Sequence, residues 1–324
     1  MLISVIICTH NPRRDYLERT LDSLRSQSLD RAEWELIVVD NQSSPPVVGM
    51  VDLSWHARAR VVIEAELGLT PARLRGIEEA RADVLLFVDD DNVLNDHYLE
   101  ETLKIFTIHP AIGCIGAGSL TPEFESEPLP ETCPYLSYLA LREVKEDYWG
   151  NQISGFIPWG AGLCVRKCVG EHYRSRVKES QASADLGRKG GSLMSGEDDE
   201  FSHVAVGNGW GVGIFVSLKI VHLIASRRLT KEYLERLIEA NGATRAYLAH
   251  LHGEDLFNPF RPTTLGRLFG LAGQVPARTL AKALYGYFTL LRASRFVRRM
   301  AQIQFDGWTT GAAKVKRLGM SDVT

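Results

Sequence analysis

Long hydrophobic runs, paired cysteines and a glycine-rich turn after the first apolar segment are what this 324-residue sequence lacks. No stretch reaches the roughly 18 uncharged apolar residues that a membrane-spanning helix needs, so no such helix is expected. Five cysteines are an odd number and lie mostly within apolar runs, which favours free thiols in a reducing compartment over a disulfide scaffold. Cys164 and Cys168 lack a second pair, which argues against a zinc site.

The composition is that of an ordinary globular protein. Apolar residues make up 45% and charged residues 24% of the sequence, which excludes a disordered or collagen-like chain. The length exceeds the ~100–200 residues of a typical domain, so we expect one large domain with a C-terminal annex, or two domains. Residues 1–16 show neither a basic start nor a small-residue cleavage site, and we read them as a buried strand and not a signal peptide.

The net charge of −3 conceals a basic C-terminal region. Residues 261–324 hold 11 Lys and Arg against 2 Asp and Glu, a balance of +9, so the other residues carry −12. An acidic body suits a cation or a neutral polar ligand better than nucleic acid, and no nucleic-acid partner is expected. A basic amphipathic helix predicted at 276–300 has three interpretations: contact with an anionic membrane, packing against the chain, which we favour, or a homo-oligomer contact. We expect a cytoplasmic location, with any peripheral contact at the inner face of the membrane.

Apolar runs and helical stripes alternate along most of the chain and predict its elements. We expect strands at 2–8, 34–39, 61–63, 84–88, 161–165 and 212–223, and helices at 14–28, 70–81, from 95, after 196, at 230–251 and at 276–300. Thr70 and Asn95 are the expected N-caps of two helices. Strands joined by such helices predict an α/β fold with a doubly wound, mostly parallel sheet flanked by helices and a helical C-terminal annex. Residues 121–160 and the polar stretch 175–196 are predicted to be loops.

Carboxylates follow two of the predicted strands, at the sheet edge where open α/β folds bind their ligands. Asp40 ends the second strand, and Asp89, Asp90 and Asp91 follow the strand at 84–88. Three adjacent aspartates are costly to hold together without a cation, and hard oxygen ligands suit Mg²⁺ or Mn²⁺. An acidic turn at the start of the next helix explains the cluster equally well.

Segments in the right order resemble family 2 glycosyltransferases of the GT-A fold. They are SVIICTHNP with LERTLDSLRSQS, then WELIVVDNQS, ELGLTPARLRGIEEARADVLLFVDDDN, PWGAGLCVRK and SGEDDEF. The resemblance covers residues 1–225, which implies a GT-A catalytic domain there and a basic, mainly helical region at 226–324. The family pattern is broken where Glu66 and Leu74 replace asparagines, whereas Arg73 is retained.

The resemblance implies a UDP- or dTDP-sugar donor and assigns residues to it. Asp40 would accept the N3–H of the uracil or thymine base, and Thr9 and Asn11 would line the same crevice. Arg73 would contact a phosphate or the base. The alternatives are a loop aspartate in an Asx-turn, turn residues after a strand, and an arginine on a solvated helix face.

The same resemblance makes residues 89–91 an Asp-x-Asp motif. Asp91 would bind Mg²⁺ or Mn²⁺, Asp89 would contact the donor's ribose or sugar, and Asp90 would support the loop. His222 would stand near the metal or the diphosphate, although a lone histidine on an apolar strand is more often a core residue. A bound cation would offset the charge that develops on the leaving nucleotide.

The acceptor side is implied by the Glu-Asp block at 197–200. Asp198 would be the catalytic base that takes the proton of the acceptor hydroxyl, and Glu197 would orient the acceptor. Acidic residues in a first helical turn are also common because they complement the helix dipole. Trp159 would stack on a sugar ring, with Gly160 letting the backbone come close, and a core tryptophan is the alternative.

The sequence therefore predicts an inverting, metal-dependent glycosyltransferase that passes a sugar from UDP or dTDP to a hydroxyl of a glycan or lipid-linked acceptor, in polysaccharide or glycolipid synthesis. One rival, a sugar-phosphate nucleotidyltransferase, needs a glycine-rich basic loop after the first strand, where CTHNPRRDY has no glycine. The other rival is a non-catalytic relative that binds nucleotide sugars, and the intact carboxylates at 89, 91 and 198 argue against it. A dinucleotide dehydrogenase is poorly supported, since no G-x-G-x-x-G follows the first strand.

Overall fold

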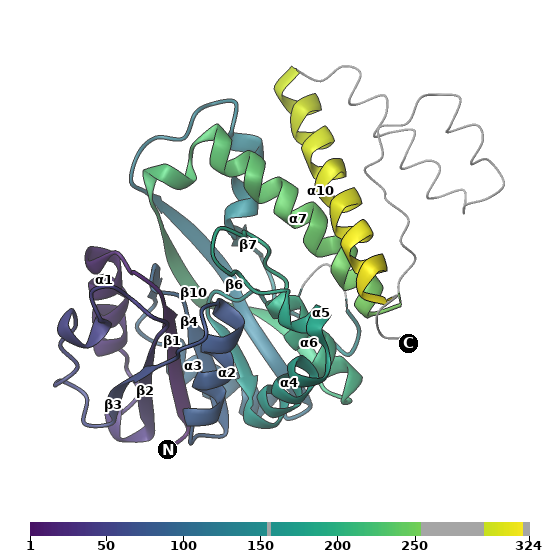
Figure 1. The fold of residues 1–324 in the computed structure, drawn as a ribbon. Coiled ribbons are helices and arrows are strands. Elements are labelled where there is room, and N and C mark those ends of the chain that lie inside the picture. Colours follow the sequence, from purple (N-terminus) through teal and green to yellow (C-terminus); the bar gives the residue numbers. More distant parts are fainter. Residues whose placement is uncertain (154–156, 254–294, 320–324) are drawn as a thin grey trace.

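A curled sheet with helices on both faces runs through the molecule (Figure 1). The computed structural model describes residues 1–153, 157–253 and 295–319. Its strands are β1 (Ile3–Thr9), β2 (Trp34–Asp40), β3 (Ala59–Ile63), β4 (Val84–Val88), β5 (Asn92–Leu94), β6 (Ile112–Phe124), β7 (Arg142–Glu143), β8 (Tyr148–Gly150), β9 (Leu163–Arg166) and β10 (Gly211–Ile224). They follow the order β3-β2-β1-β4-β9-β6-β10-β5, with β7 beside β6 and β8 beside β10. This arrangement confirms the predicted α/β fold of the GT-A type.

The long ladders of the sheet are parallel. β1 pairs in parallel with β2 and with β4. The pairings of β2 with β3 and of β6 with β10 are also parallel. β9 runs antiparallel to β4 and β6. It reverses direction because the chain leaves β6 and enters β9 at the same edge, with no α-helix between them in the described residues. The carboxyl ends of β1, β4 and β10 therefore lie together at one edge of the sheet.

Helices bury both faces of the sheet. They are α1 (Arg14–Arg25) and α3 (Tyr98–Ile108) on one face, and α2 (Leu69–Glu79), α4 (Lys167–Glu179) and α6 (Glu197–Gly207) on the other. The other helices of the described residues are α5 (Gln181–Ala184), α7 (Lys231–Leu251) and α10 (Arg295–Gly319). Val5 of β1 shares a hydrophobic cluster with Leu17 of α1, whereas its neighbour Ile6 shares the opposite cluster with Ile77 of α2. Because successive residues of β1 are buried on opposite faces, the strand reads as a continuous apolar run.

The helices α7 and α10 form a C-terminal annex in which they lie side by side (Figure 1). Their backbones approach so closely that a Cβ on Gly311 would lie 2.7 Å from the carbonyl oxygen of Ala243. Leu234 of α7 packs in one cluster with Ile224 of β10, so the annex and the sheet share buried surface. The predicted domain boundary at 225/226 stays a prediction. In the described part of the chain, every helix is too short or too polar to cross a membrane.

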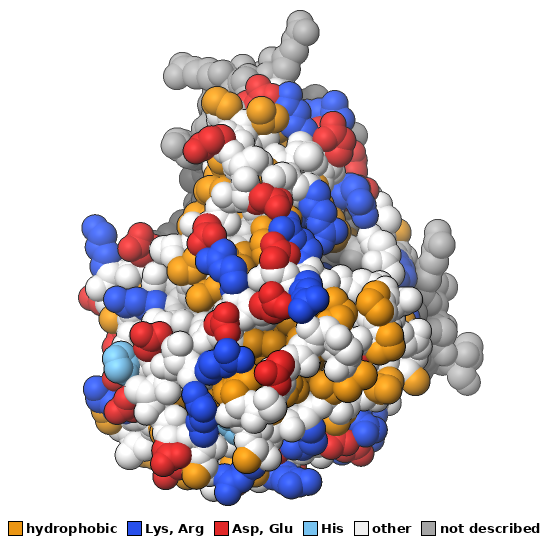
Figure 2. Space-filling model, turned by 90° about the vertical axis from the view of Figure 1, so that its left-hand side faces the viewer, with side chains coloured by type: hydrophobic (Ala, Val, Ile, Leu, Met, Phe, Trp, Pro, Cys, Tyr) orange, Lys and Arg blue, Asp and Glu red, His pale blue; other side chains and the backbone are white. Residues whose placement is uncertain are grey.

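The face that carries the N-terminal elements bears charges of both signs (Figure 2). Among the exposed pairs of the N-terminal elements, Arg13 pairs with Asp15 and Glu125, and Arg19 pairs with Glu123. Exposed pairs of this kind contribute about 0–1 kcal/mol each. The interspersed charges are therefore typical of a solvated surface.

Two predicted helix caps were wrong. α2 has Gly68 and not Thr70 as its N-cap, and α3 has His97 in that position. Asn95 instead accepts a hydrogen bond through its Oδ1 from the backbone N–H of Lys219, at 3.1 Å. It therefore ties the turn after β5 to β10, a tertiary contact that competes with local capping.

Some segments predicted as loops contain regular structure. β6 continues to residue 124, a 3₁₀ turn (η3, Cys133–Leu139) follows, and α4 extends into the stretch 175–196. Of the helix predicted at 276–300, the part before 295 lies outside the described residues. α10 runs past the predicted end to Gly319, because apolar residues continue to face α7 as far as the buried Val315.

Candidate active site

A cavity of about 1000 Å³ opens at the edge where β1, β4 and β10 end. Strand ends, the starts of α2 and α6, the loop after α5 and the inner side of α7 all contribute to its wall. The predicted site residues found in this wall are Thr9, Arg73, Asp89, Asp90, Asp91, Trp159, Gly160, Glu197, Asp198 and His222. Folding therefore brings most of the predicted site into one place.

The three aspartates after β4 turn toward different partners. Asp89 Oδ1 lies 3.9 Å from Arg73 Nη2. Asp90 accepts a hydrogen bond from the hydroxyl of Thr9, which ties β4 to β1. Burial and the neighbouring Asp91 raise the pKa of Asp90 to about 7. The turn separates the three carboxylates and does not aim them at a single ion.

Asp91 faces His222 and a second partner, Arg228, that the sequence did not single out. His222 is buried on β10, and its Nε2 lies 3.4 Å from Asp91 Oδ2. Arg228 belongs to the 3₁₀ turn η4 (Ser226–Arg228), and its Nη1 donates to the same Oδ2 at 2.9 Å and lies 3.0 Å from His222 Nε2. Although burial opposes ionisation, His222 and Arg228 hold the pKa of Asp91 below its usual value. Asp91 is therefore a carboxylate paired with the guanidinium of Arg228.

Asp91 and His222 are the candidate ligands for a metal ion. Within the described residues, no group of three or more His, Cys, Asp or Glu side chains could hold a metal ion. Mg²⁺, however, is usually bound through one or two carboxylates, water and substrate phosphates. An oxygen and an imidazole nitrogen 3.4 Å apart therefore fit a cation shared with a diphosphate better than one held by the protein alone.

A buried ion pair links α2 to α6. Arg73 and Glu197 are each 2% exposed, and Arg73 Nη1 lies 3.3 Å from Glu197 Oε1. Burial raises the pKa of Glu197, and the guanidinium of Arg73 opposes that rise. Removing one member of such a pair leaves the other charge buried and unpaired, which costs about 3–5 kcal/mol. The predicted contact of Glu197 with the acceptor stays a prediction, since Arg73 already engages this carboxylate.

Asp198 stands beside Glu197 in the first turn of α6, at the cavity wall. Its Oδ2 accepts a hydrogen bond from the backbone N–H of Gly160 at 2.9 Å, and its Oδ1 accepts one from the N–H of Asp199 at 3.0 Å. A carboxylate has about four lone-pair sites, so Asp198 can still accept a proton or a hydrogen bond from the cavity. Burial, with Asp198 and Glu197 nearby, raises the pKa of Asp199 well above its usual value.

Gly160 lies against the guanidinium of Arg73. A Cβ at this position would come within 2.6 Å of Arg73 Nη2, so a larger residue fits only if the arginine shifts. The neighbouring Trp159 carries the Arg142 guanidinium over one face, 3.5 Å from the ring centroid. Burial lowers the pKa of Arg142 to about 10. The predicted stacking of a sugar on Trp159 would therefore have to use its other face.

Asp40 and Asn11 organise a loop and do not line the cavity. Both carboxylate oxygens of Asp40 accept from backbone N–H groups, that of Ser43 at 2.8 Å and that of Val47 at 2.9 Å. The side-chain oxygen of Asn11 accepts from the N–H of Ser44 at 2.8 Å. The turn chemistry considered as an alternative is thus present at both residues, and their contact with a donor stays a prediction.

The helix α6 is anchored by the buried Glu200. His252 Nε2 lies 2.8 Å from Glu200 Oε2, and Arg176 Nε donates to Oε1 at 3.3 Å. His203 stacks on His252 with ring centroids 3.3 Å apart. Burial and the neighbouring His252 lower the pKa of His203 to about 4. These contacts fix α6 to α4 and to the end of α7.

Comparison with known proteins decides the family. The model of "Glycosyl transferase family 2" matches residues 4–165, which is half of the chain. The chain belongs to glycosyl transferase family 2. This result confirms the resemblance that the sequence motifs indicated.

Known relatives of this family 2 protein match it only in part. Uncharacterized protein y4gI of Sinorhizobium fredii is 34% identical over 113 residues, which are 34% of this chain and 12% of y4gI. The putative glycosyltransferase EpsH of Bacillus subtilis is 26% identical over 102 residues, 32% of this chain and 29% of EpsH. The matched parts thus span less than a third of either relative.

A solved structure shares the fold across nearly the whole chain. Mannosyltransferase PcManGT from Pyrobaculum calidifontis, in complex with GDP-Man and Mn²⁺, has a TM-score of 0.57 at 15% identity. The match covers 95% of this chain and 86% of PcManGT. The annex of the family 2 protein is therefore included in the likeness of fold.

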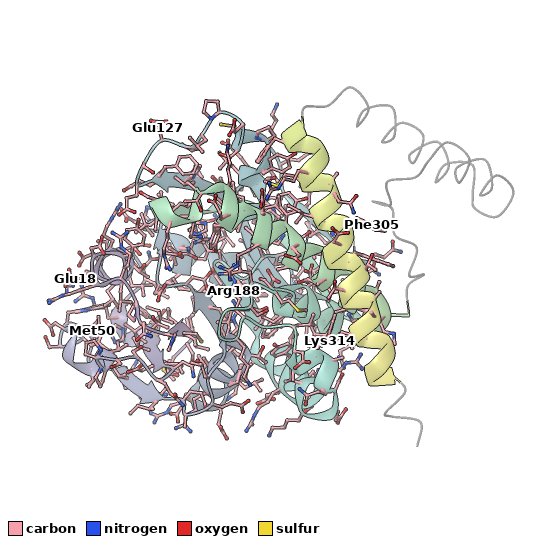
Figure 3. All side chains as sticks on the ribbon, turned by 45° about the horizontal axis from the view of Figure 1, so that its top comes forward. Glu18, Met50, Glu127, Arg188, Phe305 and Lys314 are labelled. Atoms are coloured by element: carbon pink, nitrogen blue, oxygen red, sulfur yellow. The ribbon has the colours of Figure 1, made fainter. Side chains whose placement is uncertain are left out.

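The annex forms one wall of the cavity, which the sequence motifs did not indicate. Asn241 and Thr244 of α7 and Trp308 of α10 line the cavity, together with Arg188 of the loop after α5. Figure 3 shows Arg188 near the middle of the molecule. Asn41 was also missed: it lines the cavity and follows directly after the carboxylate that ends β2. Of the cavity residues that the sequence motifs did not indicate, only Asn41 could have been found from its position at the end of a predicted strand.

Proposed function

We propose that this protein is an inverting glycosyltransferase that moves a sugar from a UDP- or dTDP-activated donor to an acceptor hydroxyl in glycan synthesis. The observation that carries the proposal is the meeting of two carboxylate clusters, at 89–91 and at 197–199, in one cavity. The first cluster can serve a cation and a diphosphate, and the second can accept a proton. These are the two demands of sugar transfer from a nucleotide, and membership of family 2 supports the assignment.

Donor binding is assigned to the edge formed by β1, β4 and β10. Arg73 and Arg228 place guanidinium groups in the cavity wall, and a guanidinium can bind two phosphate oxygens at once. Asp91 and His222 would hold Mg²⁺ or Mn²⁺, which neutralises the charge of a departing diphosphate. The complex of PcManGT with GDP-Man and Mn²⁺ supports a nucleotide sugar and a divalent cation on this fold. Asp40 would read the base through the lone pairs that its two backbone contacts leave free.

Asp198 is the proposed catalytic base. The N–H of Gly160, 2.9 Å from Oδ2, orients its carboxylate at the cavity wall. As the acceptor oxygen forms a bond to the anomeric carbon, Asp198 takes the proton of that hydroxyl. The bond from the anomeric carbon to the diphosphate oxygen breaks on the opposite side, and the electron pair leaves with the nucleotide. A single displacement of this kind inverts the anomeric centre.

The acceptor is proposed to be a glycan or a lipid-linked glycan that binds between Trp159 and the annex. Asn241 and Thr244 offer polar groups there, and Leu237 and Trp308 offer apolar surface. A mixed wall of this kind suits a sugar, which has hydroxyls at its rim and C–H groups on its faces.

We also propose a cytoplasmic location. In one variant of this proposal, the basic C-terminal region contacts the inner face of the membrane. In the described part of that region, α10 packs along α7. Most of the helix predicted at 276–300 lies outside the described residues, so its packing role stays a prediction. A homo-oligomer contact through the same region is the remaining variant.

A thermal-shift screen of nucleotides with and without Mn²⁺ tests the proposal, because a ligand that binds the native state at 100 times its Kd stabilises it by about 2.7 kcal/mol. We expect UDP or dTDP to raise the melting temperature with Mn²⁺ and to do so less in EDTA. Release of UDP or dTDP from the matching nucleotide sugar would then report turnover. No shift with any pyrimidine nucleotide would overturn the donor class, and equal shifts in EDTA would overturn the metal assignment.

A further inference from the structure

The guanidinium of Arg228 stands between the two candidate metal ligands. Its Nη1 lies 2.9 Å from Asp91 Oδ2 and 3.0 Å from His222 Nε2, while these two acceptor atoms are 3.4 Å apart. Both atoms therefore converge on one nitrogen. Residue 228 lies 137 positions from Asp91 along the chain, and the turn η4 brings it back over the end of β10.

One nitrogen of Arg228 contacts both atoms. A guanidinium can only donate, and its Nη1 carries two hydrogens, within reach of Asp91 Oδ2 and His222 Nε2. The two hydrogens of Arg228 Nη1 then serve Asp91 and His222 together. The same carboxylate oxygen and the same nitrogen lone pair are what a divalent cation would use. Arg228 thus occupies the cation position with a positive charge of its own.

We infer that Arg228 is a displaceable counter-ion that couples the binding of a divalent cation to the binding of a nucleoside diphosphate. This inference rests on the proposed function for the identity of the nucleotide. Without a nucleotide, Arg228 occupies Asp91 and His222 and weakens cation binding. When a diphosphate enters, its oxygens draw the guanidinium away from Asp91, and both ligands become free.

Charge and hydrogen-bonding capacity both favour this exchange. A doubly charged ion beside Asp91 would repel the guanidinium unless phosphate charge were added nearby. Nε of Arg228 is buried and has no hydrogen-bond partner among the described residues, so one donor of the fork is still unused. Phosphate oxygens suit such a fork, because a guanidinium can bind two of them at once.

The contrast with Arg73 argues that the Arg228 contact is the exchangeable one. The side chains of Arg73 and Glu197 are 3% and 2% exposed, whereas those of Arg228 and Asp91 are 11% and 21% exposed. Solvent and ligand therefore reach the second pair more readily. By linkage, the factor by which UDP tightens Mn²⁺ must equal the factor by which Mn²⁺ tightens UDP.

Mn²⁺ titration followed by electron paramagnetic resonance, with and without UDP, tests the inference on the full chain. Arg228→Met removes the charge and keeps the length of the side chain. We expect this variant to bind Mn²⁺ alone about tenfold more tightly than the unmodified protein, and the UDP–Mn²⁺ coupling factor to fall by about tenfold. Arg227→Met, a change at the exposed neighbouring residue, is the matched control and should change neither quantity.

The inference is overturned if Arg228→Met binds Mn²⁺ alone no more tightly than the unmodified protein, or if the coupling factor is unchanged. If Arg228→Met melts early, Arg228→Gln provides a neutral, hydrogen-bonding replacement that should also tighten Mn²⁺ alone. Failure of the proposed function would give a different result: with Mn²⁺ present, neither the unmodified protein nor Arg228→Met would bind UDP or dTDP. The affinities of the two proteins for Mn²⁺ alone would still decide the role of Arg228.

Discussion

Two carboxylate clusters share the cavity, but the backbone presents them in different ways. The donor cluster (Asp89, Asp90 and Asp91) lies in a turn after β4, where each side chain finds a partner on a different element. The acceptor cluster (Glu197, Asp198 and Asp199) lies in the first turn of α6, where the helix dipole favours negative charge. An arginine pairs with each cluster: Arg228 pairs with Asp91 of the donor cluster, and Arg73 pairs with Glu197 of the acceptor cluster while also lying 3.9 Å from Asp89.

The two clusters differ in how readily a ligand can replace the arginine that pairs with them. Arg73 and Glu197 form a closed, buried pair, which holds α6 against α2 and leaves Asp198 to face the cavity. Arg228 and Asp91 form a more exposed pair at the cavity edge, which a cation and a phosphate would replace in the exchange that we propose. Under the proposed function, these similar runs of acidic residues would serve proton transfer in one place and ion binding in the other.

The largest expected effect separates the clusters by chemistry. Asp198→Asn keeps the size of the side chain and removes its basicity, so the transfer rate should drop by roughly 10²–10⁴, the usual contribution of a positioned general base. Donor affinity should stay within about threefold, a change of roughly 0.7 kcal/mol, because Asp198 belongs to the acceptor cluster. Single-turnover kinetics and calorimetry with UDP measure the two quantities.

The matched control for that prediction is Asp199→Asn, which should do little, since burial already raises the pKa of Asp199 well above its usual value. If Asp199→Asn stops turnover while Asp198→Asn remains active, the wrong carboxylate has been assigned. If neither change slows transfer, the base lies elsewhere.

The next effect belongs to the donor cluster. Asp91→Ala should abolish the gain in UDP affinity that Mn²⁺ provides, a loss we place at ~10–100-fold from the usual effect of disturbing a metal site. Asp96→Ala, at an exposed position two residues past β5, is the control and should leave that gain intact. Calorimetry in Mn²⁺ and in EDTA provides the comparison. Equal UDP affinity of Asp91→Ala and unmodified protein in Mn²⁺ would remove Asp91 from the metal site.

A smaller effect is expected where the two clusters touch. Gly160→Ala places a Cβ 2.6 Å from Arg73 Nη2 and disturbs the N–H that holds Asp198. Overpacking of this kind costs about 1–3 kcal/mol of unfolding free energy, and transfer should slow as well. Gly150→Ala is the control, because a Cβ there has nothing within 4 Å. Equal unfolding free energies of the two variants in urea would contradict the close contact between Gly160 and Arg73.

The effect that is smallest at neutral pH concerns the anchoring of α6. Burial lowers the pKa of His203 to about 4 in the folded protein, against about 6.5 when unfolded. The unfolded chain therefore binds more protons between these values, so the stability from neutral His203 is present above pH 6.5 and is lost as the pH falls toward 4. The slope is at most about 1.4 kcal/mol per pH unit.

His203→Gln should flatten that slope, as urea unfolding at pH 7, 5.5 and 4.5 would show. The neighbouring groups that also titrate or carry charge are His252, Glu200 and Arg176. Glu200, whose pKa is lowered by His252, adds acid sensitivity at lower pH in both proteins. An unchanged slope would mean that folding does not lower the pKa of His203.

Sequence reasoning was most successful where one short segment carries the whole signal. The strands β1, β2 and β4 were predicted because burial on both faces makes each a continuous apolar run. The carboxylates at the ends of β2 and β4 were identified for the same local reason. It was less successful at helix starts, where the tertiary contact of Asn95 with Lys219 replaced the expected cap.

The amino-acid sequence by itself determined the family, the α/β fold and most of the candidate site, because each rests on patterns a few residues long. Only the tertiary structure decided what those residues touch. In the folded protein, both carboxylate oxygens of Asp40 accept hydrogen bonds from loop backbone, and Arg73 pairs with Glu197. Arg228 lies between the candidate metal ligands. The physical reason is that Asp91 and Arg228 are 137 positions apart, so their contact depends on how β10, η4 and α7 pack and not on any local pattern.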